Sequence, residues 1–141
     1  MRIYATDEDL TEWAGAPVDK APRLLRAASV LVDECTMTAI YAVDDEGCPS
    51  DPIIRDAFRD ATCAHATAWS ALGVDPDAGV AGITSVSTPT GKSLGSASLN
   101  YSVTLVEAGV QAKVSTLFAL TGQAASLIRG ALPNARVRAV D

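Results

Sequence analysis

The sequence is poor in aromatic residues, histidine and cysteine, and each shortage narrows the possible functions. Aromatic residues make up 5% of the 141 positions, and the chain has one histidine and three cysteines. The cysteines are spaced 13 and 15 residues apart with no C-x-x-C pair, and no second histidine completes a zinc set. We therefore expect Cys35, Cys48 and Cys63 to be reduced cytosolic thiols, and we expect no metal site and no cofactor.

Long apolar runs and targeting signals are also missing. The longest uncharged stretch, residues 114–128, has 15 residues and contains serine, threonine and glutamine. A membrane-spanning helix needs about 20 predominantly apolar residues. The N-terminus becomes acidic before any apolar stretch, which argues against a secretory signal. We therefore expect a soluble protein that does not associate with membranes.

Basic residues are too few and too dispersed for a nucleic-acid-binding protein. The chain has 11 basic and 17 acidic residues, a net charge of -6. Residues 1–77 hold 15 acids and 6 bases, whereas residues 78–141 hold 2 acids and 5 bases. Binding to phosphates requires a basic stripe, which this acidic body lacks. The mildly basic C-terminal part instead suits a partner that carries acidic groups.

The residues that are abundant favour a single helical domain. Apolar residues make up 48% of the chain, and alanine alone occupies 25 positions. A chain of this length forms one domain, and small side chains suit closely packed helices.

Two helices are predicted in the first 40 residues. The first begins after Thr6, whose hydroxyl can cap a first turn rich in acids, and it ends at Gly15. The second begins at Asp19 and tolerates Pro22 in its first turn. Residues at helical spacing give this second helix one buried face, formed by Leu24, Ala28, Leu31, Cys35 and Thr38 or Ala39.

A longer third helix is predicted from the Ser50-Asp51-Pro52 start signal to Gly73, after a loop over residues 41–49. A capping hydroxyl, an acid and a proline at this point are typical of a helix N-terminus. Apolar residues then repeat at spacings of three and four and form one seam, made of Ile54, Phe58, Ala61, His65, Ala68 and Leu72.

The chain changes character after the third helix. Residues 97–105 alternate between apolar and polar side chains, which predicts one strand of a β-hairpin at about 83–106. Two further helical patterns follow Glu107 and Thr121, as one helix or two, and residues 133–141 form a tail that is either frayed or docked on a partner. The predicted fold class is mainly α, with residues 1–132 forming a small helical bundle that carries one inserted β-hairpin, followed by an extended C-terminal tail.

No motif predicts an enzyme. Residues 91–95, Gly-Lys-Ser-Leu-Gly, match a nucleophile elbow and the end of a P-loop, but strand-like residues follow Gly95 where both motifs need a helix. His65 lies on the apolar seam without a neighbouring nucleophile, so we expect a buried imidazole bonded to a backbone carbonyl. The acids at 44–46 lack the spacing of a calcium loop, and Trp69 is expected in the core. We predict no catalytic residue.

The order of these parts resembles the head-to-tail adaptor family of long-tailed bacteriophages. The resemblance is carried by the short acid-capped helix, the segment 21–29 (Ala-Pro-Arg-Leu-Leu-Arg-Ala-Ala-Ser) and the long helix from Ser50 through Trp69. The polar hairpin around 91–101 and the closing segment 124–129 (Ala-Ala-Ser-Leu-Ile-Arg) extend it over nearly the whole chain.

The resemblance implies a structural protein of the phage neck, assembled in the bacterial cytoplasm and located at the head-tail junction of the virion. Copies would form a ring, twelvefold like the portal, that joins the portal to a stopper or tail-terminator protein. DNA would pass through the channel without specific binding. The tail would dock on the portal through Pro133, Arg136, Val137, Arg138 and Val140. The hairpin would contact a neighbouring copy or the next tail component through Val86, Lys92, Leu99 and Tyr101.

Two alternatives remain open from the sequence. One is another head-tail joining protein, either a stopper or a tail-completion protein, although a stopper would favour more β-structure. The other is a small helical protein-binding module with no role in a phage.

Overall fold

The described part of the chain is mainly α. The computed structural model describes residues 2–79 and 112–132. Within these ranges no β-strand forms, and an antiparallel bridge joins Val43 to Pro49. The predicted hairpin at about 83–106 and the tail at 133–141 lie outside the described residues. The helices are α1 (Asp7–Ala14), α2 (Ala21–Cys35), α3 (Pro52–Leu72), a segment at 112–118 and α6 (Gly122–Ala131).

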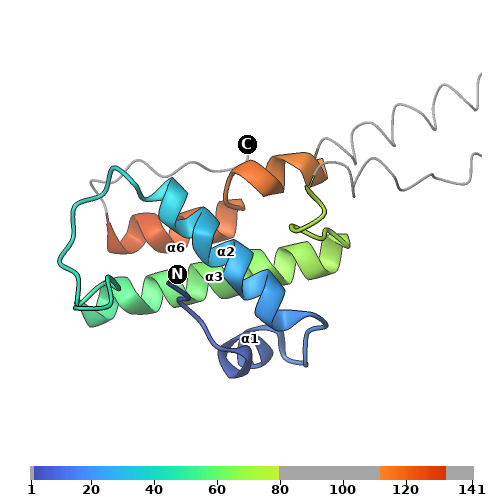
Figure 1. The fold of residues 1–141 in the computed structure, drawn as a ribbon, viewed down its shortest axis with the longest axis horizontal. Helices are drawn as coiled ribbons and strands as arrows, with labels where there is room; N and C mark the ends of the chain where they lie inside the picture. The colour runs from blue at the N-terminus through green and yellow to red at the C-terminus, as the bar shows by residue number, and fades with distance from the viewer. Residues whose placement is uncertain (1, 80–111, 133–141) are drawn as a thin grey trace, which may run out of the picture.

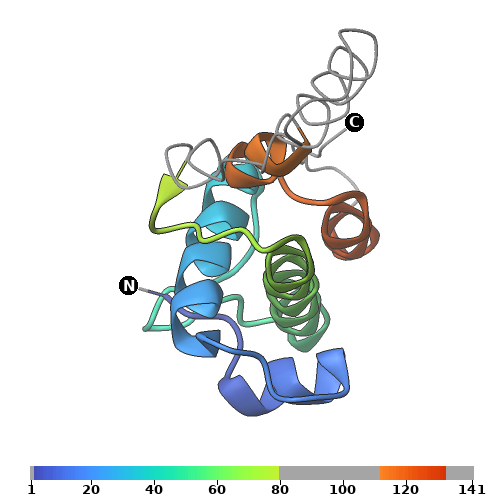
Figure 2. The same ribbon diagram turned by 90° about the vertical axis from the view of Figure 1, so that its right-hand side faces the viewer.

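Helix α3 is the centre of the bundle. Helix α2 crosses it on one side, α6 packs along another side, and α1 lies across its lower surface in the view of Figure 1. The view along the bundle shows α3 enclosed between α2 and α6 (Figure 2). Six consecutive residues of α3, 61–66, are buried. A helix that is buried all round requires small side chains, which explains the alanines of this stretch.

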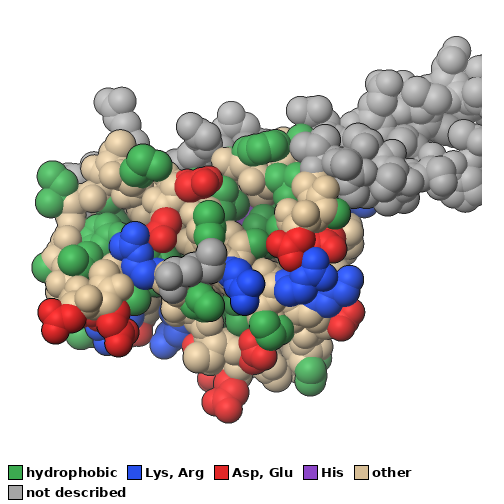
Figure 3. Space-filling view, in the orientation of Figure 1, with side chains coloured by type: hydrophobic (Ala, Val, Ile, Leu, Met, Phe, Trp, Pro, Cys, Tyr) green, Lys and Arg blue, Asp and Glu red, His purple; other side chains and the backbone are tan. Residues whose placement is uncertain are grey.

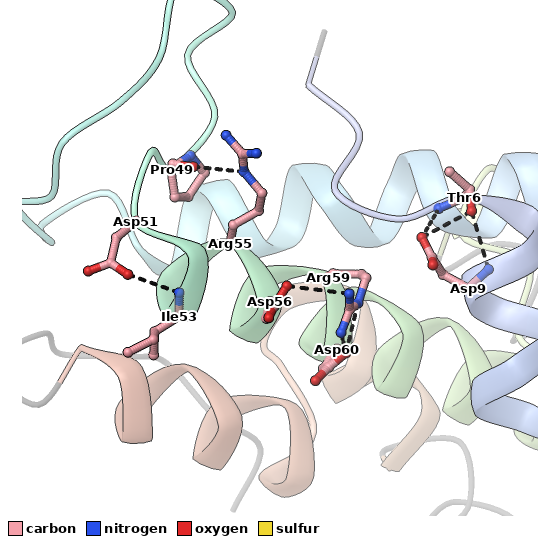
Figure 4. Close-up of polar contacts among 9 residues, drawn as sticks. All are labelled: Thr6, Asp9, Pro49, Asp51, Ile53, Arg55, Asp56, Arg59 and Asp60. Atoms are coloured by element: carbon pink, nitrogen blue, oxygen red, sulfur yellow. Dashed lines mark hydrogen bonds and ion pairs between the residues drawn. The ribbon is translucent and has the colours of Figure 1, made fainter.

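The caps of α1 and α6 confirm the sequence prediction. Thr6 accepts a hydrogen bond from the Asp9 amide, and the Asp9 carboxylate accepts one from the Thr6 amide, forming a capping box (Figure 4). Gly15 ends α1 in the left-handed conformation. The Thr121 hydroxyl accepts from the Ala124 amide at the start of α6. Because Thr121 starts a new helix after the 112–118 segment, the two C-terminal patterns are two separate helices.

The limits of α2 differ from the prediction at both ends. The helix begins at Ala21 instead of Asp19, because Lys20 adopts a left-handed conformation (φ 57°) that interrupts the helical path. It ends at Cys35, where the Thr36 hydroxyl donates to the carbonyl of Val32, so Thr38 and Ala39 lie beyond it. The predicted buried face over Leu24, Ala28, Leu31 and Cys35 is confirmed.

Helix α3 begins as predicted but its buried seam drifts. Asp51, rather than the Ser50 hydroxyl, caps the helix by accepting from the Ile53 amide (Figure 4). Phe58, Ala61 and His65 are buried as expected, but Leu72 is exposed and Trp69 occupies the buried position instead. In a straight helix, positions seven residues apart do not lie directly above one another. A seam of five turns therefore rotates around the helix, and at one end it no longer faces the neighbouring helix.

Two arginines of α3 form polar contacts, one with the α2–α3 connection and the other with acids of α3 itself. Arg55 donates to the Pro49 carbonyl and pairs with Asp44 at 3.0 Å. Arg59 pairs with Asp56 and Asp60, one on each side of it along the helix (Figure 4). These contacts are exposed or partly exposed, so each contributes little to stability but fixes the local geometry.

Candidate interaction surface

The sole histidine of the chain is part of a buried, fully satisfied polar network. The Nε2 atom of His65 lies 2.9 Å from the Thr116 carbonyl oxygen. Because a carbonyl only accepts, Nε2 carries the proton. The Nδ1 atom accepts from the Thr121 amide at 3.2 Å. The Trp69 indole N–H donates to the Thr116 hydroxyl, which itself donates to the Lys113 carbonyl. The network joins α3 to the start of α6.

This arrangement holds His65 neutral. Burial lowers the pKa of His65 to about 4, against a smaller raising effect from the hydrogen bond to Thr116. Both ring nitrogens are occupied by backbone groups, and the side chain is fully buried. A general base needs a free nitrogen within reach of a substrate. The expectation of a buried imidazole bonded to a backbone carbonyl is therefore confirmed, as is the core position of Trp69.

The other residues considered for chemistry have structural surroundings. Cys35 and Cys63 are buried, no disulfide joins the three cysteines, and burial raises the pKa of the Cys63 thiol to about 12. Asp44 accepts from the amides of Glu46 and Cys48 and so closes the tight turn of the α2–α3 connection. Within residues 2–79 and 112–132, no group of three His, Cys, Asp or Glu side chains could hold a metal ion.

The residues that the sequence assigned to contacts with other proteins lie outside the described ranges. This applies to the hairpin residues Val86, Lys92, Leu99 and Tyr101, to the tail from Pro133 to Val140, and to the Gly-Lys-Ser-Leu-Gly segment. A surface within the described part of the chain therefore has to be found from exposure and charge.

Such a surface lies on the α2–α3 connection. Met37 is 78% exposed and Ile40 is 98% exposed, and Val43 is also exposed. These three side chains, which we call the apolar edge, line one shallow hollow of about 540 Å³. Scattered single apolar residues are normal on protein surfaces, but three around one hollow are typical of an interaction site.

Backbone geometry explains why the apolar edge cannot turn inward. Thr36 ends α2, and the Ala39 amide donates to the Thr36 carbonyl, so the chain turns away from the bundle at this point. Tyr41 fills the inward position instead, with its ring 5.3 Å from that of Phe58. The sequence predicts only a loop over residues 41–49. The signal that could have revealed the edge is the placement of large aliphatic residues just beyond the last helical turn.

Acidic groups surround the apolar edge. Asp33 pairs with Arg2 and accepts from the Tyr4 hydroxyl. Burial, followed by the hydrogen bond to Asp33, raises the pKa of Tyr4. Glu34 also lines the hollow, as does Arg2, the partner of Asp33, and Asp45 and Glu46 follow in the connection, so acids outnumber bases around the edge. An apolar edge with an acidic rim suits a protein partner that presents apolar and basic side chains.

Comparisons with known proteins leave the family open. No family model matches the sequence, and neither the curated proteins nor the solved structures give a match. The resemblance to phage adaptors therefore rests on the residue pattern alone. None of the helices in the described ranges combines the length and apolarity that crossing a bilayer requires.

Proposed function

We propose that this chain is a structural, non-enzymatic protein of the phage neck. Copies form a ring adaptor that joins the portal to a stopper or tail-terminator protein and extends the DNA channel. In this proposal the ring has twelvefold symmetry and lies at the head-tail junction of the virion. DNA passes through its channel without specific binding.

The apolar edge is the observation that supports an assembly role best. A side chain as exposed as Ile40 gains nothing from the fold of a single copy, because nothing in that copy removes it from water. Contact with a neighbouring copy would remove it from water, and burial of such a side chain is worth roughly 1.5–3 kcal/mol. The net charge of -6 agrees with a protein past which DNA slides, since like charge keeps the phosphates from binding.

The proposal also assigns roles to the residues outside the described ranges. Residues 83–106 form a β-hairpin that contacts the next copy through Val86, Lys92, Leu99 and Tyr101. A hairpin with an open edge is marginal alone and gains stability from a neighbour. Residues 133–141 form an extended tail that docks on the portal, with Arg136 and Arg138 as its charged contacts.

Quantitative mass spectrometry of purified particles tests the location. We expect a copy number close to that of the portal subunit. Absence of the chain from the particles would overturn the structural role and leave a small helical protein-binding module, which the apolar edge also fits, as the better description.

A variant at the apolar edge tests the ring contact. We expect Ile40→Asp to lower ring assembly on the portal while leaving the thermal unfolding midpoint nearly unchanged, because the side chain is already in water. Ile53→Asp is the matched control, since Ile53 is also an exposed isoleucine but does not line the hollow. Equal assembly by wild type and Ile40→Asp would contradict the assignment to this edge.

Removal of the tail tests the portal contact separately. We expect deletion of residues 133–141 to abolish portal binding and to leave the circular-dichroism melting curve nearly unchanged. Undiminished portal binding by the shortened chain would refute the role of the tail.

A further inference from the structure

The solvent-facing side of α2 carries a self-complementary pattern. Arg26, Val30 and Glu34 follow one another at spacings of four residues, so they lie in one row along the helix. All three are exposed, and Val30 is 38% exposed. From the N-terminal side, the row consists of a basic, an apolar and an acidic residue, with Val30 at its midpoint. We call it the α2 row.

The α2 row lines a groove between α2 and the 112–118 segment. The groove has a volume of about 370 Å³ and is also lined by Ala27, Leu117 and Phe118. Phe118 is 58% exposed, so a large aromatic surface adjoins Val30. Neither Arg26 nor Glu34 has an ion-pair or hydrogen-bond partner among the described residues. The groove therefore combines an apolar floor with the exposed and oppositely charged side chains of Arg26 and Glu34, and Asp77, which pairs with Arg23, also lines it.

The order of charges along α2 opposes the dipole of the helix. Lys20, Arg23 and Arg26 lie toward its N-terminal end, and Asp33 and Glu34 lie toward its C-terminal end. The space-filling view shows basic side chains over the first half of α2 and acidic ones over its end (Figure 3). The helix dipole favours the reverse order. Ion pairs within the chain account for Arg23, which pairs with Asp75 and Asp77, and for Asp33, which pairs with Arg2, but no ion pair among the described residues accounts for Arg26 and Glu34.

An antiparallel pair of such helices would use the pattern fully. Rotation by 180° about an axis through Val30 places Arg26 of one copy opposite Glu34 of the other, and Glu34 opposite Arg26. Both charged residues lie about 6 Å along the helix from Val30, so the two pairs form together. The dipoles of the two helices also run in opposite directions, which is favourable.

We propose that the chain forms a two-fold symmetric dimer through the α2 row and the adjoining Phe118. The occupant of the groove is a second copy of this chain, because the charge pattern is complementary to itself and a two-fold contact uses the same surface on both copies. This contact does not rest on the proposed ring. A ring joins copies head to tail through two different surfaces. Glu34 lines both the groove and the hollow beside the apolar edge, whereas Arg26 lines only the groove and Ile40 lines only the hollow, so variants at Arg26 and Ile40 separate the two contacts.

Solution measurements test for the dimer. The full chain is studied by sedimentation velocity over a concentration range of about 1 µM to 1 mM, because a contact of this size is expected at the weak end of specific interfaces. We expect a monomer–dimer equilibrium that weakens at high salt, since the charge pairs are at the rim. A monomer at every concentration would overturn the proposal.

Charge reversal tests the face and the symmetry. We expect Arg26→Glu and Glu34→Arg each to raise the dimer dissociation constant at least about tenfold, because each change turns two attractive pairs into repulsive ones. The double variant should dimerise like wild type. Glu12→Arg, a reversal of an exposed acid on α1, is the matched control and should leave the dissociation constant unchanged.

Mixing the two single variants gives the decisive result. Arg26→Glu presents two acids on the row and Glu34→Arg presents two bases, so an equimolar mixture should form a one-to-one heterodimer although each variant alone is monomeric. Failure of the mixture to associate would overturn the antiparallel arrangement. If wild type dimerises and both reversed variants dimerise equally well, the assignment to α2 is wrong. If wild type forms species larger than a dimer and both reversals abolish them, the two-fold symmetry is wrong.

Discussion

Protonation of His65 should destabilise the folded protein in mildly acidic solution. The ring nitrogen Nδ1 accepts from the Thr121 amide, and an imidazolium has no acceptor to offer. Protonation therefore turns one hydrogen bond into a clash of two donors inside the bundle, where burial already disfavours charge. The expected effect is a loss of the contact between α3 and the start of α6.

The size of the effect follows from the two pKa values. The pKa of a free histidine is 6.5, and burial lowers the pKa of His65 to about 4 in the folded chain. Above pH 6.5 both states are neutral and the group makes no difference. Between pH 6.5 and 4 only the unfolded state binds the proton, so the free energy of unfolding decreases as the pH is lowered. One pKa unit corresponds to about 1.4 kcal/mol, which predicts a loss of roughly 3 kcal/mol by pH 4.

The assay compares wild type with His65→Gln by urea unfolding at several values between pH 7.5 and 4. Glutamine supplies both a donor and an acceptor but does not titrate, so other groups affect both proteins equally. We expect the stability of wild type relative to the variant to fall by roughly 3 kcal/mol as the pH drops. An NMR titration gives the pKa directly, since the chain has a single histidine. A pKa of His65 near 6.5 in the folded protein would refute the reasoning.

Four further substitutions test the packing and the caps, each by chemical unfolding at neutral pH. Phe58→Ala should cost about 3–5 kcal/mol, because Phe58 is fully buried and makes edge contacts with two tyrosine rings; a loss below about 1 kcal/mol would contradict the core described here. Gly130→Ala should stabilise the protein by up to about 1 kcal/mol because the site lies in α6 with open space around it, whereas Gly73→Ala should destabilise it by about 1 kcal/mol because its φ is +70°. Equal signs for the two glycines would contradict this backbone argument. Thr6→Ala should cost about 1 kcal/mol and should speed hydrogen exchange in α1, since it removes the capping box, and unchanged exchange there would show that the cap contributes nothing.

The sequence predicts those helices whose ends carry their own signals. Thr6, Asp51 and Thr121 each accept from an amide in the next turn, and Gly15 and Gly73 end their helices in the left-handed conformation. These contacts are local, so residue types within four positions suffice to identify them. The start of α2 has no such contact, because Lys20 provides no side-chain cap, and the prediction there was wrong by two residues.

The surfaces could not be predicted in the same way, because exposure depends on the packing of distant segments. Ile40 and Val30 are apolar residues in or near a helical pattern, and the sequence alone gives no reason to place them in solvent. Leu72 is exposed because the seam of α3 has drifted from its partner at that end, whereas Trp69, which the sequence places in the core, bonds to Thr116 of the 112–118 segment. The surfaces come from the arrangement of α2, α3 and the later helices.

The position of α3 between an early and a late partner affects how the chain can fold as it is synthesised. The bonds of His65 to Thr116 and Thr121 span 51 and 56 residues. At about 5–20 residues per second, a ribosome needs roughly 3–11 s to add the second partner after the first. During this interval α1, α2 and α3 can already pack together, but the side of α3 that α6 covers stays open. The newly made chain therefore presents an alanine-rich apolar face for seconds, and a chaperone that recognises such faces should bind nascent chains that end before residue 121 more strongly than the complete protein.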